Sequence, residues 1–80
     1  MHMKESVYQV VSREIKNGEN GCVIRLTNGE FKTAKQEYNA IANYCEEMLE
    51  DEFHKNYKIV LTPKKEHMEY CLYCEFHELS

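Results

Sequence analysis

Residues 33–55, which read TAKQEYNAIANYCEEMLEDEFHK, decide the fold because they predict a long helix. Thr33 and Gln36 fit a capping box at its start, and Asn56 is a suitable left-handed cap at its end. Apolar side chains recur between these caps at spacings of three and four, so they share one helical face. They are Ala34, Tyr38, Ile41, Cys45, Met48, Leu49 and Phe53. We therefore predict one amphipathic helix over about residues 34–55.

Two strands are predicted before this helix. Residues 7–15 are rich in β-branched side chains, which favour a strand. Residues 22–27 alternate clearly, with Cys22, Ile24 and Leu26 on one side. Glycines and asparagines at 17–21 predict a hairpin between the two strands, and Asn28-Gly29 predicts a turn toward the helix.

Two more strands are predicted after the helix. Residues 57–62 and 67–76 carry alternating apolar side chains, and Pro63 to Glu66 reads as the turn between them. The predicted fold class is therefore α+β, in the order ββαββ. Four mostly antiparallel strands would pack on one amphipathic helix, with a largely buried core of Ile24, Ile41, Leu49, Leu61, Leu72 and Phe76.

Length and composition predict a single folded domain over residues 4–79. The chain has 80 residues, of which 42% are hydrophobic and 30% charged. Met1 to Met3 resemble a cloning remnant followed by a start methionine. No apolar run approaches the roughly 18 residues of a membrane span, and we recognise no signal peptide. We therefore expect a cytoplasmic protein that does not bind membranes.

The C-terminal segment contains a motif with zinc-ligand spacing, formed by His67, Cys71, Cys74 and His77. On a strand, however, Cys74 would face the side opposite the other three. It would share that side with an apolar row suited to the core. We expect free thiols, no disulfide, no metal and no cofactor, and a small zinc-binding module is kept as an alternative function.

Catalysis is not predicted. The sequence has no nucleophile elbow, no glycine-rich phosphate loop and no His-Glu-x-x-His motif. His67 and Cys71 would lie on an open strand surface among carboxylates, which raise a thiol pKa and so do not activate it. We therefore expect that the protein is not an enzyme.

The distribution of charge is the most informative functional feature. The formal net charge is −4, and five acids within seven residues account for the whole excess: Glu46, Glu47, Glu50, Asp51 and Glu52. They lie at the predicted C-terminal end of the helix, where carboxylates oppose the helix macrodipole. We predict a protein-binding module that regulates or inhibits a partner with a basic surface. In one version, these carboxylates mimic the phosphates of nucleic acid.

A nucleic-acid-binding domain is the other alternative, using the strand and turn from Lys55 to Lys65. The neighbouring acids and a net negative charge argue against it, so we do not expect nucleic acid as the partner.

Finally, the single helix would leave part of the sheet uncovered. We expect Val23, Val60, Tyr73 and the strand histidines on that face, and two open strand edges. A symmetric homodimer would cover such a surface.

Overall fold

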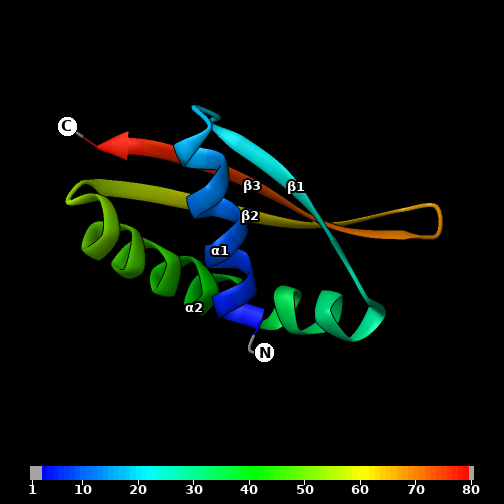
Figure 1. The fold of residues 1–80 in the computed structure, drawn as a ribbon. Helices are drawn as coiled ribbons and strands as arrows, with labels where there is room; N and C mark the ends of the chain where they lie inside the picture. The colour runs from blue at the N-terminus through cyan, green and yellow to red at the C-terminus, as the bar shows by residue number, and fades with distance from the viewer. Residues whose placement is uncertain (1–2, 80) are drawn as a thin grey trace.

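Two helices lie on one face of a three-stranded antiparallel sheet (Figure 1). The structure is a computed structural model and describes residues 3–79. The elements follow the order α1 (Met3–Lys16), β1 (Gly21–Leu26), α2 (Asn28–Phe53), β2 (Asn56–Glu66) and β3 (Glu69–Leu79). The fold class is α+β as predicted, but the ββαββ order with four strands is wrong.

The main error concerns the N-terminal segment, which is helix α1 and not a strand. Its β-branched content suggested a strand, yet Val7 and Val11 are four residues apart and both are buried. Gln9 and Arg13 are exposed on the opposite side of the same turns. Helical periodicity and packing against α2 therefore override β propensity in this segment. Met3 begins this helix, whereas Met1 and His2 lie outside the described residues.

Helix α2 begins six residues before its predicted start. The Thr27 hydroxyl accepts a hydrogen bond from the Glu30 backbone N–H (3.2 Å), and the Glu30 carboxylate accepts one from the Thr27 N–H (2.8 Å). This capping box replaces the predicted one at Thr33 and Gln36. Asn28-Gly29 is consequently the first part of the helix and not a turn.

The long helix α2 is bent, and it ends at Phe53, before its predicted end at residue 55. The backbone leaves helical geometry at Glu37, and the two halves meet there in a kink (Figure 1). Its C-cap is His54, which takes the left-handed conformation (φ 56°) and donates its N–H to the Glu50 carbonyl at 2.9 Å. The predicted cap at Asn56 is therefore wrong, because Asn56 already begins β2.

The sheet has the order β1-β3-β2, so the last strand in sequence is the central one. A two-residue turn at His67-Met68 joins β2 and β3, and Glu66 pairs with Glu69 beside it. The predicted turn at Pro63 to Glu66 is thus part of β2. Proline is tolerated there because β2 is an edge strand, on which an amide N–H can point outward without a partner.

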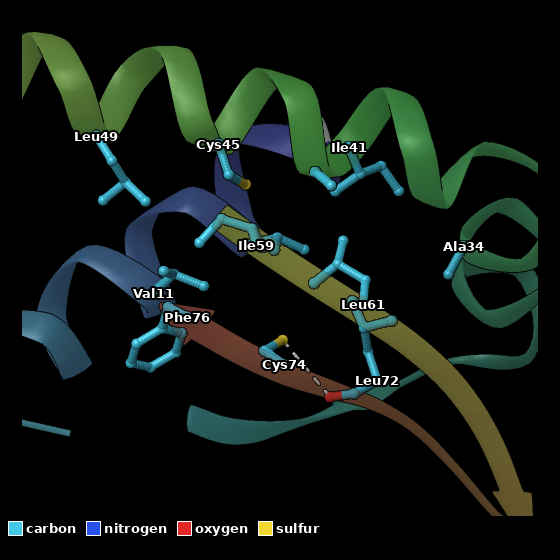
Figure 2. Close-up of a cluster of buried hydrophobic side chains, with 12 residues drawn as sticks. Val11, Ala34, Ile41, Cys45, Leu49, Ile59, Leu61, Leu72, Cys74 and Phe76 are labelled. Carbon is cyan, nitrogen blue, oxygen red and sulfur yellow. Dashed lines mark hydrogen bonds between the residues drawn. The ribbon is translucent and has the colours of Figure 1, made fainter. Parts of the chain in front are cut away.

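The core lies between the helices and the inner row of the strands (Figure 2). Five of the six predicted core residues are buried, and Ile24 is only half-buried because it lies on the edge strand β1. The buried cluster consists of Val7, Val11, Ala34, Ile41, Ala42, Cys45, Leu49, Ile59, Leu61, Leu72, Cys74 and Phe76. Within residues 3–79, neither helix is long and apolar enough to cross a bilayer.

Candidate functional site

The five predicted site acids do not form one surface, because two of them are engaged within the fold. Glu46 accepts a hydrogen bond from the Ile59 backbone N–H at 2.9 Å, and its carboxylate lies 3.7 Å from Lys58 Nζ. Glu46 therefore ties the helix to the outer edge of β2. The Ile59 N–H points away from β3 and has no partner in another strand within residues 3–79. By accepting its hydrogen bond, the Glu46 carboxylate has a structural role.

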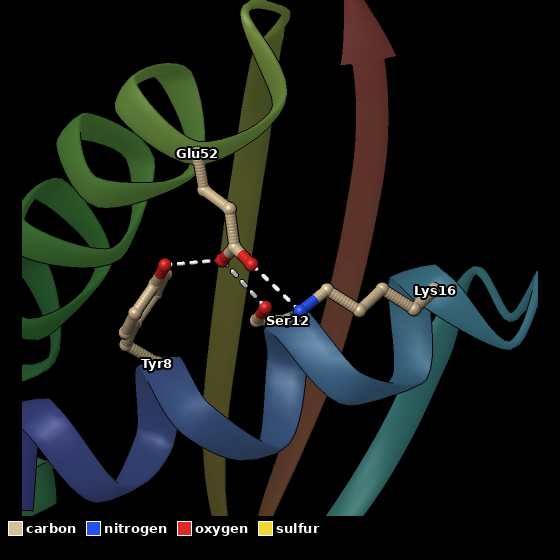
Figure 3. Close-up of polar contacts among 4 residues, drawn as sticks. All are labelled: Tyr8, Ser12, Lys16 and Glu52. Atoms are coloured by element: carbon tan, nitrogen blue, oxygen red, sulfur yellow. Dashed lines mark hydrogen bonds and ion pairs between the residues drawn. The ribbon is translucent and has the colours of Figure 1, made fainter.

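Glu52 is engaged by three side chains of α1 (Figure 3). Its carboxylate accepts hydrogen bonds from the Tyr8 hydroxyl and from Ser12 Oγ, the latter at 2.7 Å. Lys16 Nζ lies 2.7 Å from its other oxygen. Glu52 thus joins the C-terminal end of α2 to one face of α1.

This network changes the ionisation of its members. The Lys16 ammonium and the hydrogen bonds from Tyr8 and Ser12 lower the pKa of the Glu52 carboxyl to about 2. Burial, followed by the neighbouring Glu52 carboxylate, raises the pKa of the Tyr8 phenol to about 12. At neutral pH Glu52 is therefore ionised and Tyr8 is neutral, which is the pair of states that the hydrogen bond requires.

Sequence reasoning missed the three partners of Glu52 because their segment was assigned to a strand. Tyr8, Ser12 and Lys16 are each four residues apart, which is the spacing of a single helical face. On a helix this spacing brings all three side chains to one side, so it identifies the site only once the segment is known to be helical. On a strand the same three residues would also share a face, as would Val7, Val11 and Ile15, so packing against α2 is what separates a helix from a strand here.

The remaining three acids, Glu47, Glu50 and Asp51, form what we call the α2 carboxylate cluster. All three are exposed, and their side chains make no hydrogen bond or ion pair within residues 3–79. Their spacing of i, i+3 and i+4 places them on one side of the helix. They are thus the part of the predicted acidic site that remains available to a partner.

Two shallow hollows border this cluster, where the end of α2 meets the start of β2. One, of about 370 Å³, is lined by Glu50, Asp51, His54 and Asn56. The other, of about 350 Å³, is lined by residues of α2, β2 and β3, namely Asn43, Glu46, Glu47, Glu50, Asn56, Tyr57 and Leu79. Glu50 and Asn56 line both hollows, so the two hollows lie next to each other and both are acid-lined.

The backbone adds to the negative potential there. The last turn of α2 carries no basic side chain, and the negative end of the helix macrodipole lies beside the cluster. The predicted conflict between carboxylates and macrodipole therefore persists in the folded protein. A cation placed in either hollow would interact favourably with the carboxylates and with the negative end of the macrodipole.

The residues of the zinc motif are not assembled into a site. Cys74 lies in the core and its Sγ donates to the Leu72 carbonyl at 3.7 Å, whereas Cys71 belongs to the opposite row of β3. His67 lies in the hairpin turn, and His77 lies 3.4 Å from the Glu75 carboxylate. Within residues 3–79, no three His, Cys, Asp or Glu side chains are arranged to hold a metal ion.

The lysines from Lys55 to Lys65 are divided between surfaces. Lys55 pairs with Glu78 at 3.0 Å, and Lys58 faces Glu46. Lys64 lies over the Tyr73 ring and Lys65 over the Tyr70 ring, on opposite faces of the sheet because they are adjacent in β2. These side chains therefore do not form a single basic surface.

The face of the sheet opposite the helices carries the exposed residues expected of it. Val23 is 54% exposed and Val60 is 39% exposed, while Tyr73 is half-buried between their strands. His77 lies on the same row of β3, but His67 is in the turn and not on the face.

The comparisons with known proteins supply no relative. No protein-family model matches the chain, and neither curated proteins nor solved structures show a significant similarity to it. The functional interpretation therefore depends on the geometry described above.

Proposed function

We propose that this chain is a non-catalytic protein-binding module that regulates or inhibits a partner with a basic surface. The observation that carries the proposal is the α2 carboxylate cluster, in which three neighbouring acids are exposed and unpaired within residues 3–79. The adjoining acids Glu46 and Glu52 have partners within the fold. The contact surface is thus narrower than the sequence indicated, and it is centred on Glu50.

The shape of the surface supports recognition of a long cationic side chain. Glu50 lines both hollows at the helix end, and Asn56 can provide an amide oxygen beside it. A lysine or arginine of a partner would find carboxylates and the negative end of the macrodipole on the same side. Since exposed acids opposing the macrodipole cost stability in the free protein, partner binding would remove a local repulsion.

A specific version of this function is mimicry of nucleic acid. The carboxylates would occupy a basic groove of the partner that otherwise receives phosphates. In that case an oligonucleotide and this chain should compete for the same partner. Retention of the partner in the presence of excess oligonucleotide would show that this chain does not bind in the groove that receives phosphates.

The test is affinity capture with a charge-matched control. The variant Glu47→Gln, Glu50→Gln, Asp51→Asn removes the cluster, and the variant Glu5→Gln, Glu19→Gln, Glu37→Gln removes three exposed acids elsewhere. Both lose the same net charge. Proteins captured from a lysate of the native host are identified by mass spectrometry, at low and at physiological salt.

We expect a basic protein that binds the wild-type chain and the control variant but not the cluster variant. Its retention should decrease as salt rises, because exposed charge pairs are screened over about 8–10 Å. Equal capture by the two triple variants would contradict the proposal, since binding would then follow net charge and not this surface.

A further inference from the structure

The outer edge of β1 has backbone groups without partners. The Phe76 N–H donates to the Asn20 carbonyl at 3.0 Å, which fixes the alternation of hydrogen bonds between β3 and β1. The N–H and C=O groups of Gly21, Val23 and Arg25 therefore point away from β3. None of them is paired within residues 3–79. Such an edge is a template for another strand.

The opposite edge of the sheet, on β2, is protected. The outward N–H of Ile59 is occupied by the Glu46 carboxylate, and Pro63 has no N–H to offer. Lys58 and Lys64 flank this edge, and charged side chains there discourage pairing. The two edges therefore differ, and only β1 presents a continuous run of free donors and acceptors.

The side chains of β1 are also incompletely covered on both faces. Val23 is 54% exposed on the open face, although it is a strongly apolar residue. Ile24 and Leu26 pack against the core from the other face but remain half-buried. An additional strand beside β1 would bury apolar surface on both faces as well as pair the backbone.

We propose that the strand that covers this edge is β1 of a second copy of the chain. The two strands would run antiparallel about a two-fold axis at Val23, giving a continuous six-stranded sheet. Val23 then lies opposite its own copy and exchanges both backbone hydrogen bonds with it, because its N–H and C=O already point outward. Gly21 lies opposite Arg25 of the other copy.

A charge pair supports both the choice of a second copy as the added strand and the register in which the two β1 strands pair. Gly21 pairs with Glu75 in β3, so Arg25 of the second copy would lie about 10 Å from Glu75 with only the side-chain-free glycine between them. The two long side chains can meet across that gap, on the open face to which both belong. The two-fold axis repeats the contact, so each dimer gains two such pairs. The interface lies on a different surface from the α2 carboxylate cluster and does not depend on the proposed function.

The first test is the oligomeric state of the full chain. Sedimentation equilibrium from about 1 μM to 1 mM covers the affinities typical of small interfaces, and the wild-type chain should reach twice its monomer mass. Val23→Pro removes an outward N–H that the monomer does not use, so it should remain folded by circular dichroism and stay monomeric. Val60→Thr, which changes the same face of the sheet away from the β1 edge, should dimerise like the wild type.

The second test addresses the charge pair. Arg25→Glu should weaken dimerisation at least tenfold, and the double variant Arg25→Glu, Glu75→Arg should restore it. Glu69→Gln is the control, because Glu69 pairs with Arg25 within one chain at 3.3 Å and is not part of the proposed contact. Its dimer affinity should not fall, because the proposed contact is kept and a competing partner of Arg25 is removed.

The register can be measured directly by cross-linking in a Cys22→Ser background. Val23→Cys should form a covalent dimer in oxidised glutathione, whereas Val60→Cys should not. A monomer at every concentration would overturn the proposal. So would a dimer that is unaffected by Val23→Pro and Arg25→Glu. If Val23→Pro unfolds, the charge-pair variants and the cross-link decide between these outcomes.

Discussion

Lys16 Nζ lies 2.7 Å from a carboxylate oxygen of Glu52, so the last residue of α1 is tied to the last turn of α2. Together with Tyr8 and Ser12, this pair joins the two helices that cover the sheet (Figure 3). The same contact removes Glu52 from the acidic surface that the sequence predicted. The helical face of α1 therefore decides that Glu52 is paired within the fold, while the β2 edge does the same for Glu46.

Replacement of Glu52 by glutamine should destabilise the fold by about 1–2 kcal/mol. The value lies at the low end for charged hydrogen bonds because the Glu52 and Lys16 side chains are 29% and 58% exposed. Urea denaturation measures the effect, and Glu47→Gln is the control because Glu47 has no partner within residues 3–79. Equal losses in both variants would mean that the network contributes nothing.

The contribution of Glu52 should depend on pH in a defined window. The pKa of Glu52 is lowered from an ordinary value of 4.5 to about 2, so the unfolded chain binds more protons between these values. Stability from this group is present above pH 4.5 and is lost as the pH falls toward 2. The difference in unfolding free energy between wild type and Glu52→Gln should shrink over that interval.

The contribution of the Tyr8 phenol to stability should be lost at high pH, whereas that of Glu52 is lost at low pH. Its pKa is raised from 10 to about 12, so its contribution is complete below pH 10 and is lost as the pH rises toward 12. Tyr8→Phe should therefore be less sensitive than the wild type to alkaline denaturation. An identical alkaline midpoint for both proteins would show that the Tyr8–Glu52 hydrogen bond does not stabilise the fold.

Substitution of His54 by glycine should stabilise the protein by about 0.5–1 kcal/mol. His54 holds the left-handed conformation (φ 56°, ψ 34°) at the C-cap of α2, which glycine adopts without a Cβ penalty. His54→Ala is the matched control, since it removes the imidazole but keeps the Cβ. The melting temperature should rise only for the glycine variant.

Truncation of Leu72 should cost more than truncation of Ile24. Leu72 is 0% exposed in the core, so Leu72→Ala should lose about 2–5 kcal/mol. Ile24 lies directly opposite in the register but is half-buried, and Ile24→Ala should lose about half as much. Chemical denaturation of both variants compares a central with an edge strand, and a smaller loss at Leu72 would contradict the assigned core.

One of the four thiols should react faster than the others. Cys22 is half-buried, and its interaction with the opposite thiol of Cys74 lowers its pKa. Burial raises the pKa of Cys45 to about 12, and the pKa of Cys74 is shifted upward by the interaction with Cys22 and by burial. Native titration with a chromogenic disulfide should show one fast thiol that is absent in Cys22→Ser. A fast phase that survives this substitution would assign it elsewhere.

Local pattern was sufficient to identify the buried faces of α2 and β3. The alternation around Leu72 and Cys74 correctly placed both in the core and Cys71 on the opposite row, although Cys71 is buried there and not on an open surface as expected. The spacing of Ile41, Cys45 and Leu49 correctly gave the buried face of α2, although Tyr38, assigned to the same face, is 43% exposed. In these elements the burial of one face outweighs other local preferences, so the periodicity of apolar residues in the sequence identifies the buried face.

The tertiary structure alone decided the first element and the composition of the site. Val7 and Val11 are compatible with a strand by propensity, and only packing against α2 selects the helix. Once that helix is formed, its side chains bind Glu52, while the β2 edge binds Glu46. Sequence determined that the negative charge is concentrated in one segment. Which carboxylates remain free depends on tertiary contacts, 40 positions apart between Ser12 and Glu52 and 13 apart between Glu46 and Ile59, and no local pattern encodes these.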